Sequence, residues 1–251
     1  MNVLTSRQNP LCTHLRKLCA QSRYRRESGE YLADGRKLWD EAVRWKAPIK
    51  RLITTPEVQV DLPHGVEHTA VSPQLMEYLS PMKSPQGFLF TLAISEGEPP
   101  KLEGERYLAL DGLQDPGNVG TIWRTADALG ADGLFLLNHC ADPYGPKTVR
   151  AAMGASFRLP AWEVTLEELK SLLDERDLPL YAAALTAECR EVRHADLHRC
   201  AMVVGNEGHG VSREVLDACD EAVVIPMRPR CESLNAATAA AILLWEMGRV
   251  E

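Results

Sequence analysis

Two stretches of the chain place polar side chains and glycines directly after an apolar run. The first spans residues 107–138, where the run 107–110 predicts a buried strand that leads through a polar turn into a helix. Asn118 is expected to cap this helix, and Arg124 follows Gly120 by four residues, so the two share one helix face. A glycine there leaves the guanidinium open to a substrate, with an ordinary solvated arginine as the alternative.

The second stretch begins with residues 201–205, AMVVG, which predict another strand. The spacing of Gly205 and Gly208 exposes backbone amides at the strand end, as the polar groups of a ligand require. Glu207 lies in the same loop, at the carboxyl end of a strand where parallel sheets place their ligands, although a plain loop carboxylate is the alternative. Residues 233–235 then open a final helix, 236–247, with an alanine-rich start.

Strands and helices alternate along the chain, which predicts an α/β protein. In residues 1–95 the pattern gives helices at 9–21, 36–45 and 73–79 and strands at 30–33, 52–54 and 87–94. Beyond residue 107 it gives strands at 107–110, 133–137, 180–185, 201–205 and 222–227 and helices near 147–155, 166–176 and 212. Residues 96–106, rich in proline, glycine and charge, read as a linker, so we expect domains at 1–95 and 107–251.

The charges are unevenly distributed. The chain has a formal net charge of −7, yet residues 1–51 hold 12 Lys and Arg against 5 Asp and Glu. Such asymmetry suggests that one half meets a polyanion, with a solvated basic surface as the alternative. The basic residues that could follow RNA phosphates are Arg7, Arg16, Lys17, Arg23, Arg25, Arg26, Arg36 and Lys37.

Several other classes of protein lack their sequence signatures here. The chain has no dinucleotide-binding glycine pattern, no phosphate-binding loop and no nucleophile elbow. Its seven cysteines and seven histidines show no metal-ligand spacing, so no metal site is expected. No segment approaches the roughly 18 consecutive apolar residues of a membrane span, and the N-terminus has no apolar signal region, so we expect a soluble cytoplasmic protein.

Three segments in order resemble the motifs of the SpoU/TrmH family of RNA 2′-O-ribose methyltransferases, of the SPOUT superfamily. They are DPGNVGTIWRTADALG (115–130), VVGNEGHGVS (203–212) and IPMRPRCESLNAATAAA (225–241). The resemblance covers residues 107–248 closely. Residues 1–94 are similar, more loosely, to the substrate-binding module of rRNA-modifying members, through SRQNPLCTHLRKL and SPQGFLF.

The resemblance implies a fold and a set of roles. It implies a small N-terminal α/β RNA-binding module, and a C-terminal domain with a mainly parallel sheet and a deep trefoil knot that binds S-adenosylmethionine. It assigns the cofactor to Gly205, Asn206, Gly208, Ile225, Pro226, Met227 and Leu234. It assigns to Arg124 assistance in deprotonating the ribose 2′-hydroxyl. Because guanidinium groups stay protonated, we expect Arg124 to act by charge stabilisation and positioning. Asn118, Glu207, Ser233 and Asn235 match polar positions that shape the site.

The resemblance also implies a homodimer with the knot region at its interface. The N-terminal module favours rRNA over tRNA as the substrate, most specifically 23S rRNA. A tRNA 2′-O-methyltransferase and a catalytically silent RNA-binding or ribosome-assembly protein are the alternatives. Comparing methyl incorporation into rRNA and tRNA, and replacing Arg124, would separate the three.

Overall fold

The computed structural model describes residues 3–94, 101–186, 188–228, 230 and 233–249. The chain packs into two compact units, Met1–Glu96 with Tyr144–Phe157, and Gly97–Pro143 with Arg158–Glu251. The segment Tyr144–Phe157 thus packs in unit 1, whereas the sequence placed it inside the expected domain 107–251. Part of the expected linker 96–106, residues 96–100, lies outside the described residues.

Unit 1 is built around a four-stranded sheet of order β1-β4-β2-β3, in which only β2 and β3 run parallel. Its elements are α1 (Pro10–Ala20), α2 (Ser22–Ser28), β1 (Glu30–Asp34), α3 (Arg36–Arg44), β2 (Ile49–Thr54), β3 (Glu67–Ala70), α4 (Pro73–Leu79), β4 (Phe88–Ala93), α6 (Pro146–Ala152) and the short η1 (Ala155–Phe157).

Apolar clusters form the core of unit 1. One joins α1 and α4 to the sheet through residues such as Leu15, Leu75 and Leu89. The other joins α3 to the sheet and also takes in Val149 of α6. Tyr144 packs its ring 5.1 Å from that of Tyr31. Residues 144–157 belong to unit 1 because Val149 is buried in this core and Tyr144 and Phe157 pack against it, a long-range arrangement that local periodicity does not reveal.

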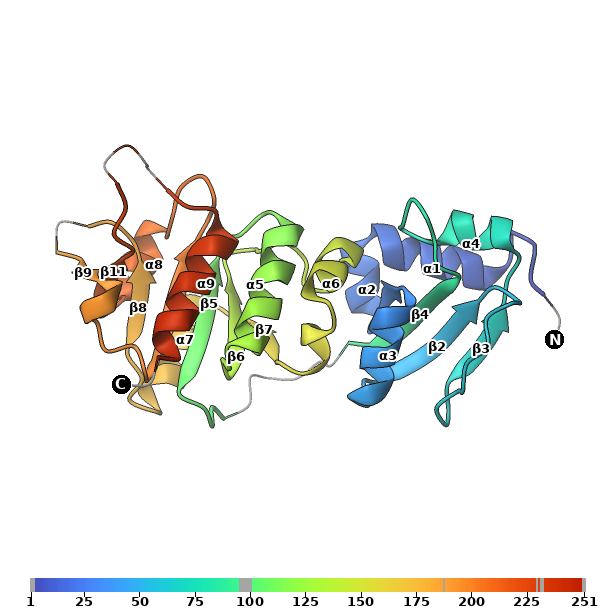
Figure 1. The fold of residues 1–251 in the computed structure, drawn as a ribbon, viewed down its shortest axis with the longest axis horizontal. Coiled ribbons are helices and arrows are strands. Elements are labelled where there is room, and N and C mark those ends of the chain that lie inside the picture. Colours follow the sequence, from blue (N-terminus) through green and yellow to red (C-terminus); the bar gives the residue numbers. More distant parts are fainter. Residues whose placement is uncertain (1–2, 95–100, 187, 229, 231–232, 250–251) are drawn as a thin grey trace. The chain divides into compact units, whose positions relative to one another are not determined.

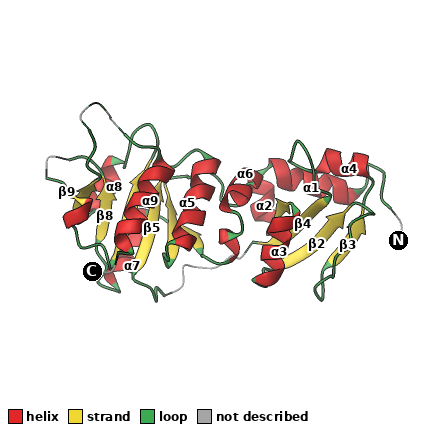
Figure 2. Cartoon of the chain, viewed as in Figure 1, coloured by secondary structure: helices red, strands yellow, loops and turns green. Residues whose placement is uncertain are grey.

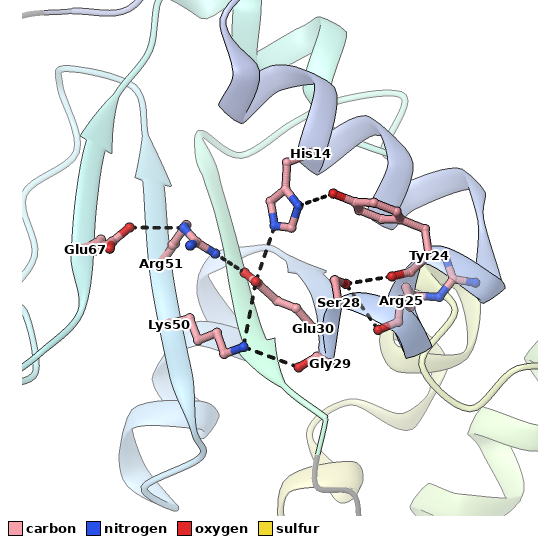
Figure 3. Close-up of polar contacts among 9 residues, drawn as sticks. All are labelled: His14, Tyr24, Arg25, Ser28, Gly29, Glu30, Lys50, Arg51 and Glu67. Carbon is pink, nitrogen blue, oxygen red and sulfur yellow. Dashed lines mark hydrogen bonds and ion pairs between the residues drawn. The ribbon is translucent and has the colours of Figure 1, made fainter.

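A buried carboxylate in unit 1 contacts side chains of neighbouring elements (Figure 3). Glu30 is 4% exposed, and its oxygens lie 2.5 Å from Arg51 Nη1 and 3.3 Å from His14 Nε2. Burial alone would raise the pKa of Glu30, but its contacts with His14, Thr91 and Arg51 lower it to about 2. The carboxylate therefore stays ionised and links β1 to Arg51 of β2 and to His14 of α1.

Unit 2 contains a seven-stranded sheet of order β7-β6-β5-β10-β8-β11-β9 with parallel pairing throughout. Its strands are β5 (Arg106–Asp111), β6 (Gly133–Leu137), β7 (Ala161–Glu163), β8 (Leu180–Ala183), β9 (Arg190–Glu191), β10 (Cys200–Gly205) and β11 (Glu221–Val224). Its helices are α5 (Pro116–Ala128), α7 (Leu166–Asp174), the short η2 (Val192–His194), α8 (Arg213–Ala218) and α9 (Ala236–Met247). The predicted mainly parallel α/β architecture is confirmed.

Helices cover both faces of this sheet, as a parallel sheet with buried strands requires. Alternate strand residues such as Tyr107, Phe135 and Val203 join α7 and α8 in one apolar cluster. The intervening residues are also buried and point to the opposite face. There α5 and α9 lie side by side (Figures 1 and 2). This arrangement fixes the start of α5 and the start of α9 at one end of the sheet.

The start of α5 differs from the prediction in one residue. Asp115, not Asn118, is the N-cap, because Asp115 Oδ1 accepts a hydrogen bond from the Asn118 backbone amide at 2.9 Å. Pro116 then occupies the first helical position, where its missing N–H costs nothing. The predicted cap at Asn118 is wrong. Because Asp115 caps the helix, the Asn118 side chain is available for contacts outside its own helix.

Most other elements match the predicted ranges within a few residues, and α4, β6 and α9 match fully. The sequence analysis missed α2, β3, β7 and β9, which are short. In the part of the chain that the structure describes, no helix has the length and apolar character needed to span a bilayer.

Candidate functional site

The strand order places the functional loops at one position of the second sheet. From β5 the chain adds β6 and β7 on one side, and β10 pairs with β5 on the other. Loops that leave the carboxyl ends of β5 and β10 therefore start next to each other, at the reversal of strand order where open parallel sheets bind ligands. These loops carry residues 112–115 and 206–212.

A cavity of about 420 Å³ opens at the carboxyl ends of β8, β10 and β11. Six of the seven residues predicted to hold the cofactor line it: Gly205, Asn206, Gly208, Ile225, Met227 and Leu234. Pro226 lies between two of them, is exposed, and does not line the cavity. Glu207 and Ser233 from the predicted catalytic set also line it. The volume is in the range of small-molecule sites.

The cavity wall combines small residues with an apolar rim. Ala183, Ala184, Ala236 and Ala239 leave space inside, while Leu185, Met227 and Leu234 are 83%, 39% and 37% exposed. Large apolar side chains gathered around an opening indicate a surface that a ligand covers. Sequence analysis missed the β8 side of this wall because alanines and a leucine after a strand have no distinctive spacing.

Gly205 makes the close approach of two chain segments possible. A Cβ atom at this position would lie 2.1 Å from Gly210 C and from Val211 N. The loop from Asn206 to Gly210 folds back on the strand end, and these two residues exchange backbone hydrogen bonds of 2.9 Å. Asn206 Nδ2 also donates to the Gly112 carbonyl at 2.7 Å, and Gly208 N donates to Asn206 Oδ1 at 2.8 Å. The loop is thereby fixed with its backbone at the cavity.

Side chains from all three motif segments meet at Asn118. Asn118 Nδ2 donates to Glu207 Oε1 at 2.9 Å, and Asn235 Nδ2 donates to Asn118 Oδ1 at 3.2 Å. Asn235 is also the N-cap of α9, with Oδ1 accepting from the amides of Ala237 and Thr238. The starts of α5 and α9 are therefore tied to the loop after β10.

The Glu207 carboxylate accepts two further hydrogen bonds, from the backbone amides of Gln114 and Asp115 at 3.3 Å each. Burial alone would raise the pKa of Glu207, but the hydrogen bonds from Asn118, Gln114 and Asp115 lower it below its ordinary value. A carboxylate held ionised in this way orients its neighbours and is a poor proton acceptor near neutral pH.

Asp111 is a second anchoring carboxylate that the sequence analysis missed. It ends β5, is 2% exposed, and accepts hydrogen bonds from Ser212 N through Oδ2 and from Asn138 Nδ2 through Oδ1, at 2.6 and 2.7 Å. It thus joins the ends of β5, β6 and the loop after β10. The available signal was its position, because Asp111 is a charged residue that directly follows the apolar run 107–110.

Arg124 lies outside the cavity. It projects from the exposed side of α5, and among the residues that the structure describes its guanidinium has no hydrogen bond or ion pair. Gly120, on the same helix, is buried. Within one chain, then, the structure brings Asn118, Glu207 and Asn235 together and leaves the Arg124 guanidinium apart from them.

The predicted RNA-contacting residues of unit 1 divide into exposed and buried side chains. Arg7 and Arg16 both lie over the ring of Tyr78, at 4.5 and 5.1 Å, and Lys17 lies 5.1 Å from the ring of Tyr24. Arg23, Arg26, Arg36 and Lys37 are exposed, with Arg23 and Arg36 in ion pairs along their own helices. These seven cations are accessible to a polyanion.

Arg25 is the exception. It is 5% exposed, and its Nη1 donates to the carbonyls of Leu18 and Cys19 at 2.5 and 3.4 Å. These carbonyls belong to the last turn of α1, where helical partners are missing. Arg25 therefore stabilises the junction of α1 and α2, and its predicted contact with RNA is wrong.

Residues 105–245 match the SpoU rRNA Methylase family, and residues 9–89 match the MRM3-like substrate binding domain. The chain belongs to the SpoU rRNA methylase family. It is an RNA methyltransferase, and its methyl donor is S-adenosylmethionine.

Relatives of similar length support the assignment. The chain is 33% identical to an uncharacterised tRNA/rRNA methyltransferase of Synechocystis, over 98% of this chain and 93% of the relative. It is 31% identical to the 23S rRNA (guanosine(2553)-2′-O)-methyltransferase RlmP of Bacillus subtilis, over 89% and 90%.

Solved structures agree. The SpoU methyltransferase AviRb of Streptomyces viridochromogenes, in complex with AdoMet, is 28% identical, covers 96% of this chain and 97% of its own, and superposes with a TM-score of 0.88. An AdoMet-bound rRNA methyltransferase of Sinorhizobium meliloti is 30% identical, with a TM-score of 0.86 and coverage of 98% and 97%.

Proposed function

We propose that this SpoU-family enzyme transfers a methyl group from S-adenosylmethionine to a ribose 2′-hydroxyl of 23S rRNA. The observation that supports this most is the cavity at the ends of β8, β10 and β11, where the loop fixed by Glu207 and Asn118 meets the apolar rim. The matching substrate-binding domain and the rRNA-modifying relative favour rRNA over tRNA. An rRNA substrate is in turn consistent with the expected cytoplasmic location.

The residues of the cavity fit the methyl donor. Apolar side chains of Ile225, Met227 and Leu234 offer surface for its adenosine part, and the backbone of residues 205–208 offers polar groups. When bound, the donor supplies a methyl group on a positively charged sulfur, which is already activated for transfer. The chain must then bind the ribose, orient its hydroxyl and handle the proton that leaves it.

We assign Glu207, Asn118 and Asn235 to positioning. Each holds another of the three in place, and their hydrogen bonds fix the starts of two helices beside the cavity. Ser233 lines the cavity and is exposed, so its hydroxyl is available to the ribose. Arg124 is assigned to stabilising the developing 2′-oxyanion.

That role for Arg124 requires a second copy of the chain. The guanidinium is exposed and lies outside its own cavity, and beside it α9 presents an apolar surface that includes Trp245, which is 65% exposed. We propose a homodimer formed through α5 and α9, in which Arg124 of one subunit serves the cavity of the other. The trefoil knot implied by the family is part of the same proposal.

Mixing two inactive variants tests the dimer. Arg124→Ala leaves the cavity intact, whereas Gly208→Trp fills it; a Cβ at Gly208 meets only Asn206 Oδ1, at 3.5 Å, so the loop can accept the side chain. If Arg124 acts across the interface, a mixture of the two variants recovers about one quarter of wild-type turnover, since half of the dimers carry one complete site. Activity no higher than that of either variant alone would contradict this arrangement.

The substrate is tested by supplying tritiated S-adenosylmethionine with purified unmodified rRNA or tRNA. We expect label in 23S rRNA and background in tRNA. Label in tRNA would favour the tRNA-modifying alternative. Absence of transfer to either RNA, with RNA binding retained and unaffected by Arg124→Ala, would favour a silent RNA-binding protein.

A further inference from the structure

Another cavity lies in unit 1, and none of the roles assigned above uses it. It measures about 350 Å³ and is lined by β1, α3, α6, the end of α1 and the residues that follow α4. Its apolar walls include Leu32, Leu38, Met82 and Val149. Such a volume and lining are typical of sites for small molecules.

One carboxylate faces this apolar space. Asp34, at the end of β1, lines the cavity, and its Oδ2 accepts a short hydrogen bond from the Ser80 hydroxyl. Ser80 is 6% exposed, and its Oγ in turn accepts from Met82 N at 2.9 Å, so the carboxylate is held in one orientation. Within the described part of the chain, Asp34 Oδ1 has no hydrogen-bond partner. Asp34 is partly exposed, so a ligand in the cavity can donate a hydrogen bond to this open oxygen.

The other polar residues of the cavity are cationic or neutral. Lys147 and Arg150 of α6 are exposed at its edge, and the charge of Arg150 acts on Asp34. Burial raises the pKa of the Cys19 thiol to about 11, so Cys19 forms a neutral part of the wall. The cavity thus offers an acceptor pair inside, apolar faces on its sides and two positive charges at its edge.

Among the RNA bases, guanine matches this arrangement. Its Watson–Crick edge presents two donors side by side, N1–H and N2–H, which fit the two oxygens of one carboxylate. Oδ2 can accept a second bond, because each carboxylate oxygen has two acceptor sites. Adenine and cytosine have a ring acceptor beside their single amino donor, and uracil has a carbonyl on each side of its N–H. Each of these bases would therefore place at least one acceptor against an oxygen of Asp34, which is unfavourable.

We propose that this cavity holds an unpaired guanine of the RNA substrate, with Asp34 reading its Watson–Crick edge and Arg150 and Lys147 near its phosphate. The proposal rests on the proposed RNA substrate and adds a base-specific contact at a site that is not the site of methyl transfer. Proteins commonly read single-stranded RNA in this way, by enclosing a splayed base between side chains and bonding its edge.

The test measures binding of the full-length protein to fluorescein-labelled heptamers of sequence UUUGUUU, UUUAUUU, UUUCUUU and UUUUUUU by fluorescence anisotropy. We expect the guanine heptamer to bind at least about 5-fold more tightly than the others, as expected for a bidentate contact to one base. Asp34→Asn should reduce the preference to less than about 2-fold, because the amide replaces one acceptor by a donor. Asp61→Asn, which removes an exposed carboxylate of the same unit outside the cavity, should keep the preference.

Two further arms complete the test. Guanosine monophosphate is used as competitor; displacement at concentrations as low as those of the guanine heptamer would overturn an RNA source for the base. A further measurement uses the wild-type protein alone. A heptamer with 6-thioguanine at its centre is crosslinked to this protein by near-ultraviolet light. Crosslinks should map to residues 32–38, 79–82 or 146–150. Crosslinks elsewhere, or no guanine preference, would overturn the proposal.

The outcome is independent of the proposed activity. A wild-type enzyme that methylates rRNA without guanine preference loses this inference alone. A protein that prefers the guanine heptamer but transfers no methyl group to rRNA keeps the guanine site and loses the proposed function.

Discussion

Asn118 Nδ2 lies 2.9 Å from Glu207 Oε1, and this hydrogen bond joins the start of α5 to the loop after β10. The two residues are 89 positions apart in the chain. Since Asn118 also accepts from Asn235, one amide side chain connects three segments that border the methyl-donor cavity.

Replacing Asn118 with alanine should therefore lower both turnover and stability. The variant leaves Glu207 and Asn235 without their shared partner, which we expect to cost about 1–3 kcal/mol of unfolding free energy. Displacement of the ribose by the loosened loop should reduce kcat about 100-fold. Steady-state kinetics and urea unfolding measure the two effects. In a double-mutant cycle with Glu207→Ala the losses should be far from additive, and additive losses would show that the two residues act separately.

Gly205→Ala should disturb the loop 206–211, because the added methyl group would meet the backbone of Gly210 and Val211 at 2.1 Å. We expect a loss of several kcal/mol in stability or no measurable affinity for S-adenosylmethionine. Gly208→Ala is the matched control, since a Cβ there has room. Calorimetric titration with the cofactor distinguishes them, and equal affinity of both variants would argue against the fixed loop.

The stability of unit 1 should depend on pH through the ionisation of Glu30 (Figure 3). Its pKa is lowered from 4.5 to about 2 in the folded protein, so the stability it contributes is present above pH 4.5 and is lost as the pH falls toward 2. This contribution amounts to about 3 kcal/mol. Glu30→Gln should therefore be less stable than wild type at pH 7 and should lose less stability between pH 4.5 and pH 2. Thermal unfolding at a series of pH values provides the measurement; parallel curves for the two proteins would contradict the assignment.

Trp245→Lys tests the proposed dimer surface from the other side. Trp245 is 65% exposed on α9, so its replacement should leave the fold of one chain unchanged while weakening an apolar interface. Light scattering after gel filtration should show monomers, and turnover should fall with cofactor affinity retained. A dimer of unchanged stability would place the interface elsewhere.

Local sequence patterns predicted most helices and strands of this fold, but they predicted few of the contacts between distant segments. Apolar runs at 107–110, 133–137 and 201–205 identified buried strands because a parallel sheet buries both strand faces. The short β7 and β9 carry too few residues for a period to appear. The packing of residues 144–157 in unit 1 depends on contacts with distant strands, which no local spacing encodes.

The site shows the same division. Its glycines and amides were predictable as a set, since ligands at strand ends need backbone access. The cap at Asp115 was missed because two amide or carboxylate residues stood within three positions, and only geometry decides between them. The role of Arg25 was misjudged because charge counts treat every arginine as exposed, whereas this one satisfies the carbonyls at the end of α1.

Identifying the methylated atom tests the proposed ribose methylation directly. Unmodified 23S rRNA is incubated with S-adenosylmethionine and the wild type, Gly208→Trp or Arg124→Ala, then digested to nucleosides and analysed by mass spectrometry. We expect one 2′-O-methylated nucleoside with the wild type and none with either variant. A methyl group on a base, or full activity of Gly208→Trp, would contradict it.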